Sequence, residues 1–272
     1  MNKKSLAYPY LIWSAIFVIV PLFLIVYFSF FIDGQFTLAN YAKFMEDYYI
    51  KAMGRSLWMA LISTIICLLL AYPLAMILSS KEMSGKSIIL ILVVLPMWMN
   101  SLLRTYAWAN LLENNGVLNN ILKSLHLIDK EIQFLYGNGG IIFGMVYNFF
   151  PFMVLPIYNV LVKMDHHLIE ASHDLGANKW TTFRKVILPL SMPGVVTGII
   201  MVFMPSLTTF LITRLLGGGK VMLIGNVIEE QFTRTGDMGF GSAISMLMMI
   251  VVLVTLAVMS RKGSLDKGGG LF

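Results

Sequence analysis

The sequence predicts an all-α polytopic membrane protein with six transmembrane helices joined by polar loops. Of the 272 residues, 58% are hydrophobic and only 12% are charged, and the mean hydropathy of +0.79 is far above that of an ordinary soluble domain. Six apolar runs each reach the roughly 20 residues needed to cross the bilayer hydrocarbon. The segments between them show no second domain and no internal repeat, so one membrane domain, residues 1–272, accounts for the chain.

The first run follows Lys3 and Lys4 and carries no charged side chain. It ends in the sequence Ser-Phe-Phe-Ile-Asp at residues 29–33, which differs from the small-residue cleavage site of a signal peptide. We therefore expect an uncleaved first helix. The six predicted spans cover residues 8–31, 56–79, 87–111, 139–162, 193–216 and 241–260.

Proline and glycine recur inside these runs. In lipid, a backbone carbonyl freed by proline needs another partner, so kinks are tolerated where helices pack together or line a cavity. The prolines therefore indicate helices that bend or move. Gly140 with Gly144, and Gly194 with Gly198, place small residues four apart and predict close approach between helices. The prolines within the spans include Pro21, Pro73, Pro96, Pro151, Pro156 and Pro205.

The distribution of Lys and Arg predicts a cytoplasmic N-terminus and C-terminus, because the cytoplasmic loops of membrane proteins are enriched in these residues. In this orientation eleven basic residues lie on the inner side, namely Lys3, Lys4, Lys81, Lys86, Lys163, Lys179, Arg184, Lys185, Arg261, Lys262 and Lys267. Eight lie in the longer outer segments, namely Lys43, Lys51, Arg55, Lys123, Lys130, Arg214, Lys220 and Arg234. The loop of residues 163–190 then lies in the cytoplasm.

This loop is the longest polar interruption on the predicted inner side. Leu168 and Leu175, with small residues between them, recur at helical spacing and give a narrow apolar stripe. Gly176 is expected to end this first short helix, since glycine accepts the positive φ common at a helix C-terminus. Asn178 can cap a second short helix, and Pro189 is expected to stop regular hydrogen bonding before the next span. The sequence thus predicts a compact helical knob at the membrane face, suited to a groove on a soluble partner.

The pattern Glu-Ala-x-x-x-Leu-Gly-Ala from Glu170, followed by Ile-Leu-Pro-Leu and Pro-Gly, resembles the cytoplasmic coupling loop of permease subunits from bacterial ABC importers that work with a binding protein. Ser172 departs from the usual alanine, although a small residue still fits. The alternative is an amphipathic loop helix of no special purpose. The resemblance implies that the residues coupling the chain to an ATPase are Glu170, Ala171, Ser172, Leu175, Gly176, Ala177, Leu188 and Pro189.

The third run carries Arg104, the one charge deep within any predicted span. Asn100, Arg104 and Trp108 follow at four-residue steps and are expected to share one helix face. A charge at the bilayer centre costs roughly 3 kcal/mol or more, so Arg104 should face a cavity or a carboxylate. One interpretation is a substrate pathway, and the other is a structural arginine that snorkels outward or pairs with Glu113. The predicted pathway residues are Trp98, Asn100, Arg104, Tyr106, Trp108 and Tyr147.

The third-span pattern Leu-Pro-x-Trp-x-Asn-Ser-Leu-Leu-Arg-x-Tyr and the outer pattern Gly-Gly-x-Lys-x-x-Leu-Ile-Gly-Asn-Val-Ile resemble the first permease subunit of spermidine/putrescine importers, over nearly the entire chain. The resemblance implies a type I importer permease in the bacterial cytoplasmic membrane. It also implies a heterodimer with a second homologous permease, two ATPase subunits and an extracytoplasmic polyamine-binding protein. ATP and Mg would be bound by the partner ATPase, with no cofactor in this chain.

A polyamine carries several positive charges, yet no Asp or Glu lies within any of the six runs. Aromatic faces bind ammonium groups with roughly 0.5 to 2 kcal/mol each, and the predicted pathway contains several. Acidic groups remain in the partner permease or in the outer loops, where the chain has Glu113, Glu229, Glu230 and Asp237. Import of an anion or a neutral solute by an ABC permease remains open on the residues alone.

Other functional classes find less support. Basic residues are spread over the membrane edges and form no stripe for nucleic acid. The single cysteine, Cys67, has no partner for a disulfide, and we find no nucleophile elbow, zinc-protease helix or paired carboxylates within a span. We therefore expect a transport subunit and not an enzyme. A stand-alone secondary transporter stays open, although such carriers more typically show inverted repeats and ionisable midplane groups.

Overall fold

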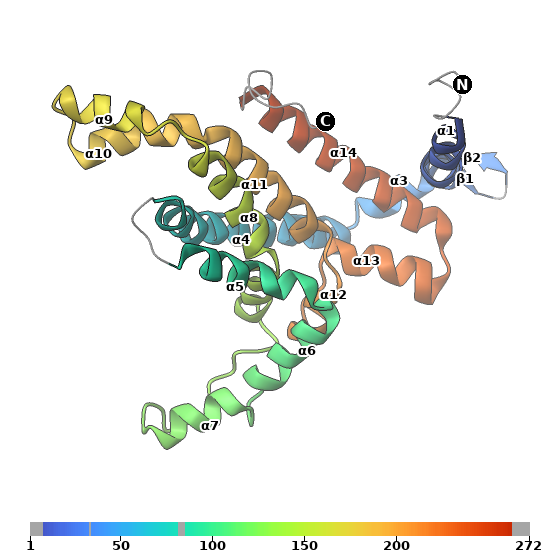
Figure 1. Cartoon of the computed structure of the whole chain (residues 1–272). Helices are drawn as coiled ribbons and strands as arrows, with labels where there is room; N and C mark the ends of the chain where they lie inside the picture. The colour runs from blue at the N-terminus through green and yellow to red at the C-terminus, as the bar shows by residue number, and fades with distance from the viewer. Residues whose placement is uncertain (1–7, 33, 81–84, 263–272) are drawn as a thin grey trace.

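A computed structural model describes residues 8–32, 34–80 and 85–262, and confirms the all-α fold class (Figure 1). Lys3, Lys4, Lys81 and Lys267, which contribute to the predicted orientation, lie outside these ranges. The helices are α1 (Tyr8–Ser14), α2 (Val20–Phe30), α3 (Ala39–Phe44), α4 (Asp47–Ser79), α5 (Lys86–Trp98), α6 (Ser101–Leu112), α7 (Val117–Ser124), α8 (Asn138–Val162), α9 (His167–Asp174), α10 (Lys179–Thr182), α11 (Leu188–Thr208), α12 (Leu211–Leu216), α13 (Ile224–Glu230) and α14 (Met238–Lys262). Three π-helical segments are η2 (Ala15–Ile19), η3 (Phe183–Ile187) and η4 (Gln231–Thr235), and strands β1 (Phe31–Ile32) and β2 (Gln35–Phe36) form an antiparallel hairpin.

Five helical stretches of the described chain are long and apolar enough to cross a membrane, and a sixth crossing is a bent helix pair. The five are residues 12–30, 47–79, 138–162, 179–208 and 238–259. Four of them contain most of the predicted spans 8–31, 56–79, 139–162 and 241–260. The other two predicted spans, 87–111 and 193–216, do not form single helices.

The run 87–111 was expected to be one helix, and this prediction was wrong. α5 ends at Trp98 and α6 begins at Ser101, and the helical stretches 87–98 and 101–124 are bent by 99° relative to each other. Met99 is extended, with ψ at 146°, and the side chain of Asn100 accepts a hydrogen bond from the backbone N–H of Leu102 at 2.8 Å. Asparagine is a strong N-cap, so it starts a new helix here and does not continue the old one.

The run 193–216 is also interrupted. α11 ends at Thr208, which precedes an extended Thr209, and α12 begins at Leu211. Pro205 removes one hydrogen bond from the last turn of α11. The backbone carbonyl of Phe210 accepts from the N–H of Arg214 at 3.0 Å, the first hydrogen bond of α12, and also from the side chain of Asn226 at 2.9 Å. The break is thus stabilised from α13.

Pro189 does not stop the helix, contrary to expectation. The helical run continues from Lys179 to Thr208 through η3, and Pro189 lies at the start of α11, directly after η3. At this position the backbone hydrogen bonding changes from the π-helical to the α-helical pattern. The helix therefore tolerates proline, which has no N–H and has a φ fixed near the helical value. The stem of the 163–190 loop is therefore continuous with a membrane helix.

Helices α4, α8 and α11 pack together and form the centre of the molecule. One apolar cluster of buried side chains from all three helices includes Ala71 of α4, Ile157 of α8 and Val195 of α11. The close approach predicted from the glycines is present, because a Cβ added at Gly194 would lie 2.7 Å from the backbone carbonyl oxygen of Pro156. Small residues thus let α11 contact the α8 backbone.

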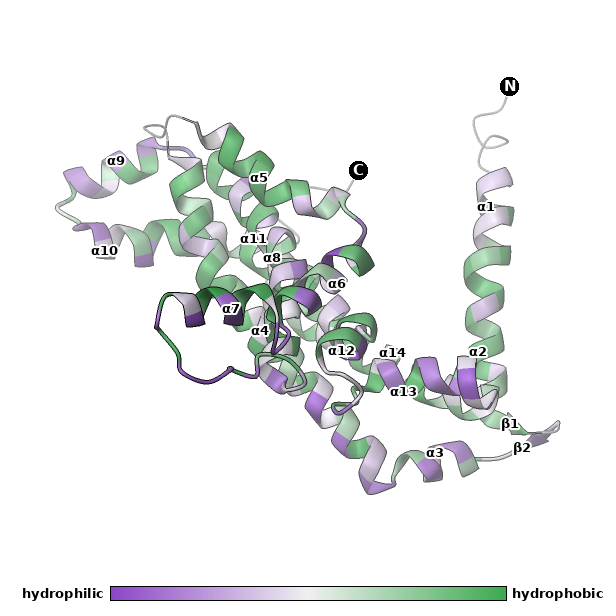
Figure 2. Cartoon of the chain, turned by 90° about the horizontal axis from the view of Figure 1, so that it is seen from below, coloured by the Kyte–Doolittle hydropathy of each residue, from purple (hydrophilic) through white to green (hydrophobic). Residues whose placement is uncertain are grey.

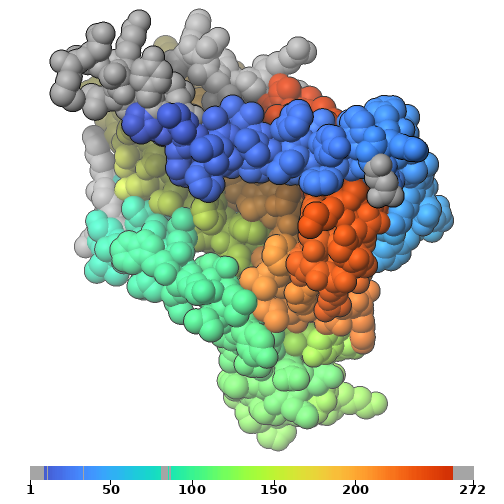
Figure 3. All heavy atoms as spheres, turned by 90° about the vertical axis from the view of Figure 1, so that its right-hand side faces the viewer, coloured from blue at the N-terminus to red at the C-terminus, as the bar shows by residue number. Residues whose placement is uncertain are grey.

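The N-terminal helix, formed by α1, η2 and α2, stands off from this centre (Figure 2). Within the chain α2 packs mainly against α14, and in the space-filling view the N-terminal segment lies along the atoms of α14 (Figure 3). Large apolar side chains along it, among them Trp13, Phe17 and Phe23, are exposed. Such a surface requires lipid or another protein chain as its neighbour.

The α8–α11 contact generates the first prediction. Gly194→Ala should lower the thermal unfolding midpoint of the detergent-solubilised protein by several degrees, since overpacking against backbone costs about 1 to 3 kcal/mol. Gly139→Ala, at the exposed start of α8 where an added Cβ meets nothing within 4 Å, is the matched control and should leave the midpoint unchanged. Equal midpoints for the two variants would contradict the packing assignment.

Candidate functional site

Two groups of short helices mark the two ends of the helix bundle. The segment α9–α10 joins α8 to α11 at one end (Figure 1). At the opposite end lie α3, α7, α12 and α13. Contacts between distant segments hold this second group together, because Lys43 pairs with Asp237 at 3.1 Å and the backbone N–H of Tyr136 donates to the carbonyl of Leu216 at 2.8 Å.

The knob, defined as residues 167–182, is a helix–turn–helix. Gly176 has a φ of +78° and ends α9, as the sequence predicts. Its N–H donates to the carbonyl of His173 at 2.8 Å, which is a typical glycine-terminated helix end. The side chain of Asn178 then accepts from the N–H of Thr181 at 2.8 Å and caps α10, also as predicted.

Ser172 connects the two short helices. Its hydroxyl lies 2.9 Å from the hydroxyl of Thr182 and also donates to the carbonyl of Ile169 at 2.7 Å. Both Ser172 and Thr182 are buried. The N–H of Ala177 donates to the backbone carbonyl of Ser172 at 3.0 Å. The hydroxyl contact with Thr182 holds α9 against α10 on their buried side.

The exposed surface of the knob is formed by other residues. Glu170, Ala171, Leu175 and Gly176 are exposed, and the side chain of Leu175 is 89% exposed at the tip. Trp180 of α10, 67% exposed, was missed by the sequence prediction although a tryptophan in a polar loop is a recognisable signal. Two further predicted coupling residues lie on the stem in α11, where Leu188 is half-buried and Pro189 is exposed. Their part in coupling stays a prediction.

A mostly apolar cavity of about 240 Å³, with a few polar side chains in its wall, lies between α6, α8 and the α11–α12 break. We call it the Arg104 cavity. The side chain of Arg104 is buried at 8% exposure, and its Nε and Nη1 atoms have no hydrogen-bond acceptor in the described part of the chain. Neither the predicted pairing with Glu113 nor any other ion pair of Arg104 is present among the described residues. Other residues of the wall are Ser101, Thr105, Asn148, Phe152 and Leu211.

Asn148 was not selected from the sequence. Its Nδ2 atom donates to the carbonyl of Gly144 at 2.9 Å and to the hydroxyl of Thr105 at 3.4 Å, while its Oδ1 is buried without a donor in the described chain. An asparagine inside an apolar run is a signal that was available, because polar groups inside membranes often mark functional positions.

The structure brings together only part of the predicted pathway. Trp108 packs edge-to-face on Tyr147, with ring centroids 5.2 Å apart, and the Tyr147 ring lies 5.9 Å from the guanidinium carbon of Arg104. Trp98 is 84% exposed at the end of α5 and Tyr106 is exposed on α6, so neither joins this group. Asn100 caps α6 from outside the helix and does not share its face, contrary to expectation.

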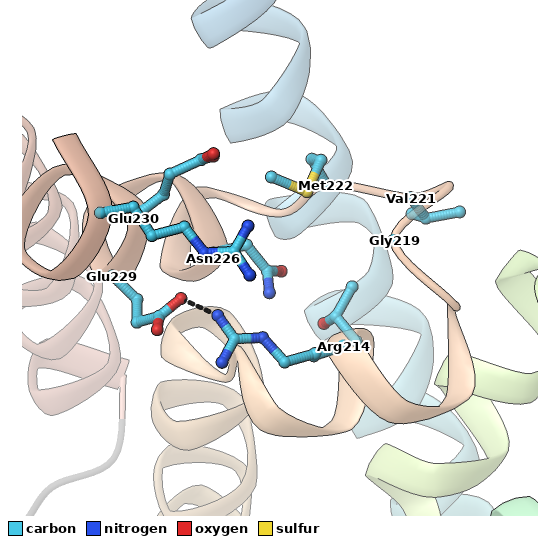
Figure 4. Close-up of a pocket in the computed structure, with 9 residues that line it drawn as sticks. Arg214, Gly219, Val221, Met222, Asn226, Glu229 and Glu230 are labelled. Atoms are coloured by element: carbon cyan, nitrogen blue, oxygen red, sulfur yellow. Dashed lines mark hydrogen bonds and ion pairs between the residues drawn. The ribbon is translucent and has the colours of Figure 1, made fainter.

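A second pocket, of about 150 Å³, lies at the end opposite the knob, between α12 and α13 (Figure 4). Arg214 of α12 forms an ion pair with Glu229 of α13, and Glu230 and Asn226 also line the pocket. The hydrogen bond from Arg214 holds the pKa of the Glu229 carboxyl below its ordinary value, and Glu229 in turn raises the pKa of Arg214. The pocket therefore carries both signs of charge.

The chain matches, over residues 1–262, the family described as "Binding-protein-dependent transport system inner membrane component". It is 39% identical over 260 residues to the spermidine/putrescine transport system permease protein PotB of Escherichia coli K12, which covers 93% of this chain and 94% of that protein. The PotB protein of Haemophilus influenzae is 38% identical, over 93% and 91% of the two chains. A bacterial ABC transporter involved in the import of the acidic polysaccharide alginate has the same fold, with a TM-score of 0.82 at 16% identity over 97% and 96% of the chains.

The Arg214–Glu229 pair predicts a pH dependence. Because the pKa of Glu229 is lowered in the folded state, its contribution to stability is present above the ordinary carboxyl pKa and is lost as the pH falls through the folded-state value. As the pH falls below about 5, the unfolding midpoint of wild type should thus fall more steeply than that of Glu229→Gln. Glu230→Gln, which removes a neighbouring carboxylate without an ion pair in the described chain, should keep the wild-type slope. Parallel curves for all three proteins would contradict the pairing.

Proposed function

Because the chain belongs to the family of binding-protein-dependent transport system inner membrane components, we propose that it forms half of the translocation pathway of an ATP-driven importer of polyamines. The observation that carries the polyamine assignment is the 39% identity to a spermidine/putrescine permease across nearly the whole chain. The chain is a multi-pass inner-membrane permease subunit. Its function is transport, while the ATP-hydrolysing step belongs to other subunits.

The knob is the proposed docking site for an ATPase. It projects from the bundle on a stem continuous with α11, and Leu175 and Trp180 present exposed apolar surface at its tip. A short amphipathic helix of this kind fits an apolar groove on a soluble partner. This assignment places the knob, and with it the N- and C-termini, in the cytoplasm.

The proposed assembly contains a second, homologous permease, two ATPase subunits that bind ATP and Mg, and an extracytoplasmic polyamine-binding protein. Two features support further protein neighbours in the membrane. The N-terminal helix leaves most of its apolar surface without a partner in this chain, and Trp98 projects at the α5–α6 break. The end opposite the knob, with α7 and α13, is the proposed face toward the binding protein.

The proposed mechanism is alternating access. Closure of the ATPase subunits on ATP draws the knobs of the two permeases together, and the rigid α4–α8–α11 centre transmits that movement. The helix breaks after Trp98 and Thr208 lie beside the middle of α8, because Ser101 and Thr209 line one cavity with Asn148, and the breaks act as hinges of the outer gate. The binding protein then releases its polyamine into the open cavity.

Polyamine contacts are proposed for aromatic and acidic groups near the outer end. Trp108 and Tyr147 present ring faces near the pathway, and Glu230 lines the outer pocket. Contacts of this kind are weak individually, which suits a transporter that must release its cargo. The buried guanidinium of Arg104, which has no ion pair among the described residues, favours a second candidate cargo, a small anion.

Transport by the complete complex tests the polyamine assignment. In vesicles containing both permeases and the ATPase, with the binding protein outside, spermidine or putrescine should stimulate ATP hydrolysis and enter the lumen. An unrelated small anion is the control and should do neither. Uptake of the anion with no response to either polyamine would replace the assignment by the second candidate.

Gly176 provides a test of the knob. Gly176→Val places a β-branched residue at a φ of +78°, which costs about 1 to 2 kcal/mol, so uptake should fall about tenfold at unchanged subunit levels. Gly34→Val is the matched control, because Gly34 has a φ of +79° in the β1–β2 hairpin, far from the knob, and is equally free of neighbours within 4 Å. Its uptake should stay within about twofold of wild type. Normal uptake by Gly176→Val would count against the knob as the coupling element.

A further inference from the structure

The Arg104 cavity contains a positive charge that no described residue of this chain neutralises. Arg104 is only 8% exposed, and two of its nitrogen atoms, Nε and Nη1, are buried without an acceptor in the described chain. Tyr147 offers a ring face at 5.9 Å and Asn148 a neutral oxygen, and neither cancels the charge. Because arginine stays protonated in proteins, the buried site needs a negatively charged acceptor from elsewhere.

The chemistry of the cavity excludes two neighbours. A polyamine presents only N–H donors and positive charge, so it cannot pair with Arg104. Lipid tails carry no acceptor and cannot satisfy a desolvated guanidinium. A carboxylate supplies both the charge and two coplanar acceptor oxygens, the geometry that matches the guanidinium fork.

The surroundings of the cavity indicate a protein as the source of this carboxylate. The cavity lies between the two helix breaks, with Ser101 exposed at its edge. Most of its wall is apolar, with Phe149, Phe152 and Ile212 among the lining residues. Leu103 and Phe210, which are next in sequence to residues of the wall, are 64% and 41% exposed. An apolar surface that surrounds a buried charge suits a protein interface within the membrane, where a polar side chain docks into a complementary pocket.

We propose that the Arg104 cavity receives a carboxylate side chain of the second permease subunit, forming an ion pair across the permease interface at the level of the helix breaks. This inference rests on the proposed two-permease assembly. The pair would hold the broken helices of this chain against the partner. It would also neutralise Arg104, so that a polycation can pass nearby without repulsion.

Charge exchange tests the proposal in the complete complex. Arg104→Glu should reduce uptake, and the recovery of both permeases in one complex, about tenfold or more, because two carboxylates would face each other. Each Asp and Glu of the membrane-embedded part of the second permease is then changed to Lys, alone and together with Arg104→Glu. One such Lys variant should be defective alone and should restore at least a third of wild-type complex recovery and uptake when combined with Arg104→Glu.

Arg214→Glu is the matched control, since Arg214 pairs with Glu229 of this same chain. Its defect should be relieved by Glu229→Arg and by no change in the second permease. Recovery of the complex is measured separately from uptake, so the charge exchange can be assessed even if the wild-type complex does not transport polyamines. A wild-type complex that does not transport polyamines would refute the proposed cargo but not the proposed ion pair.

Two results would overturn the inference. One is the absence of any Lys substitution in the second permease that restores Arg104→Glu. The other is an unfolding midpoint of the wild-type complex that rises with added formate while that of Arg104→Met does not, because a free anion would then occupy the cavity. Arg104→Met keeps much of the unbranched apolar stem of the side chain without the charge, so it also separates loss of charge from loss of packing.

Discussion

Backbone hydrogen bonding at the helix breaks is the constraint on which the rest of this structure depends. A break within the membrane frees N–H and C=O groups that hydrocarbon cannot satisfy. Here polar side chains supply part of what is lost, since Asn100 accepts from Leu102, Ser56 accepts from the N–H of Ile224 at 2.8 Å, and Asn226 gives the carbonyl of Phe210 a second donor. The Arg104 cavity lies beside both breaks.

The position of the break in α11 also decides how far the knob is continuous with the centre of the molecule. Glycine-mediated contact keeps α11 against α8, and the helical run from the knob through η3 into α11 is unbroken until Thr208. Movement of the knob is therefore transmitted along α11 to the break after Thr208. The proposed gate lies there, and the proposed energy input lies at the other end.

Local signals in the sequence were sufficient for some features and insufficient for others. Gly176 and Asn178 predicted their turn and cap correctly, because both effects depend on the residue itself and its nearest backbone. The break at Asn100 was missed because apolar residues continue on both sides of it, so hydropathy alone predicts a single span. Ser172 and Asn148 act through contacts with Thr182 and Thr105, ten and 43 positions away, which no local pattern contains.

The placement of the N-terminal helix bears on biosynthesis. This segment is synthesised well before α14, its main neighbour in the chain. Its packing against α14 can form only after the intervening helices have been synthesised, so a nascent chain that stops before residue 238 lacks the helix that covers this segment.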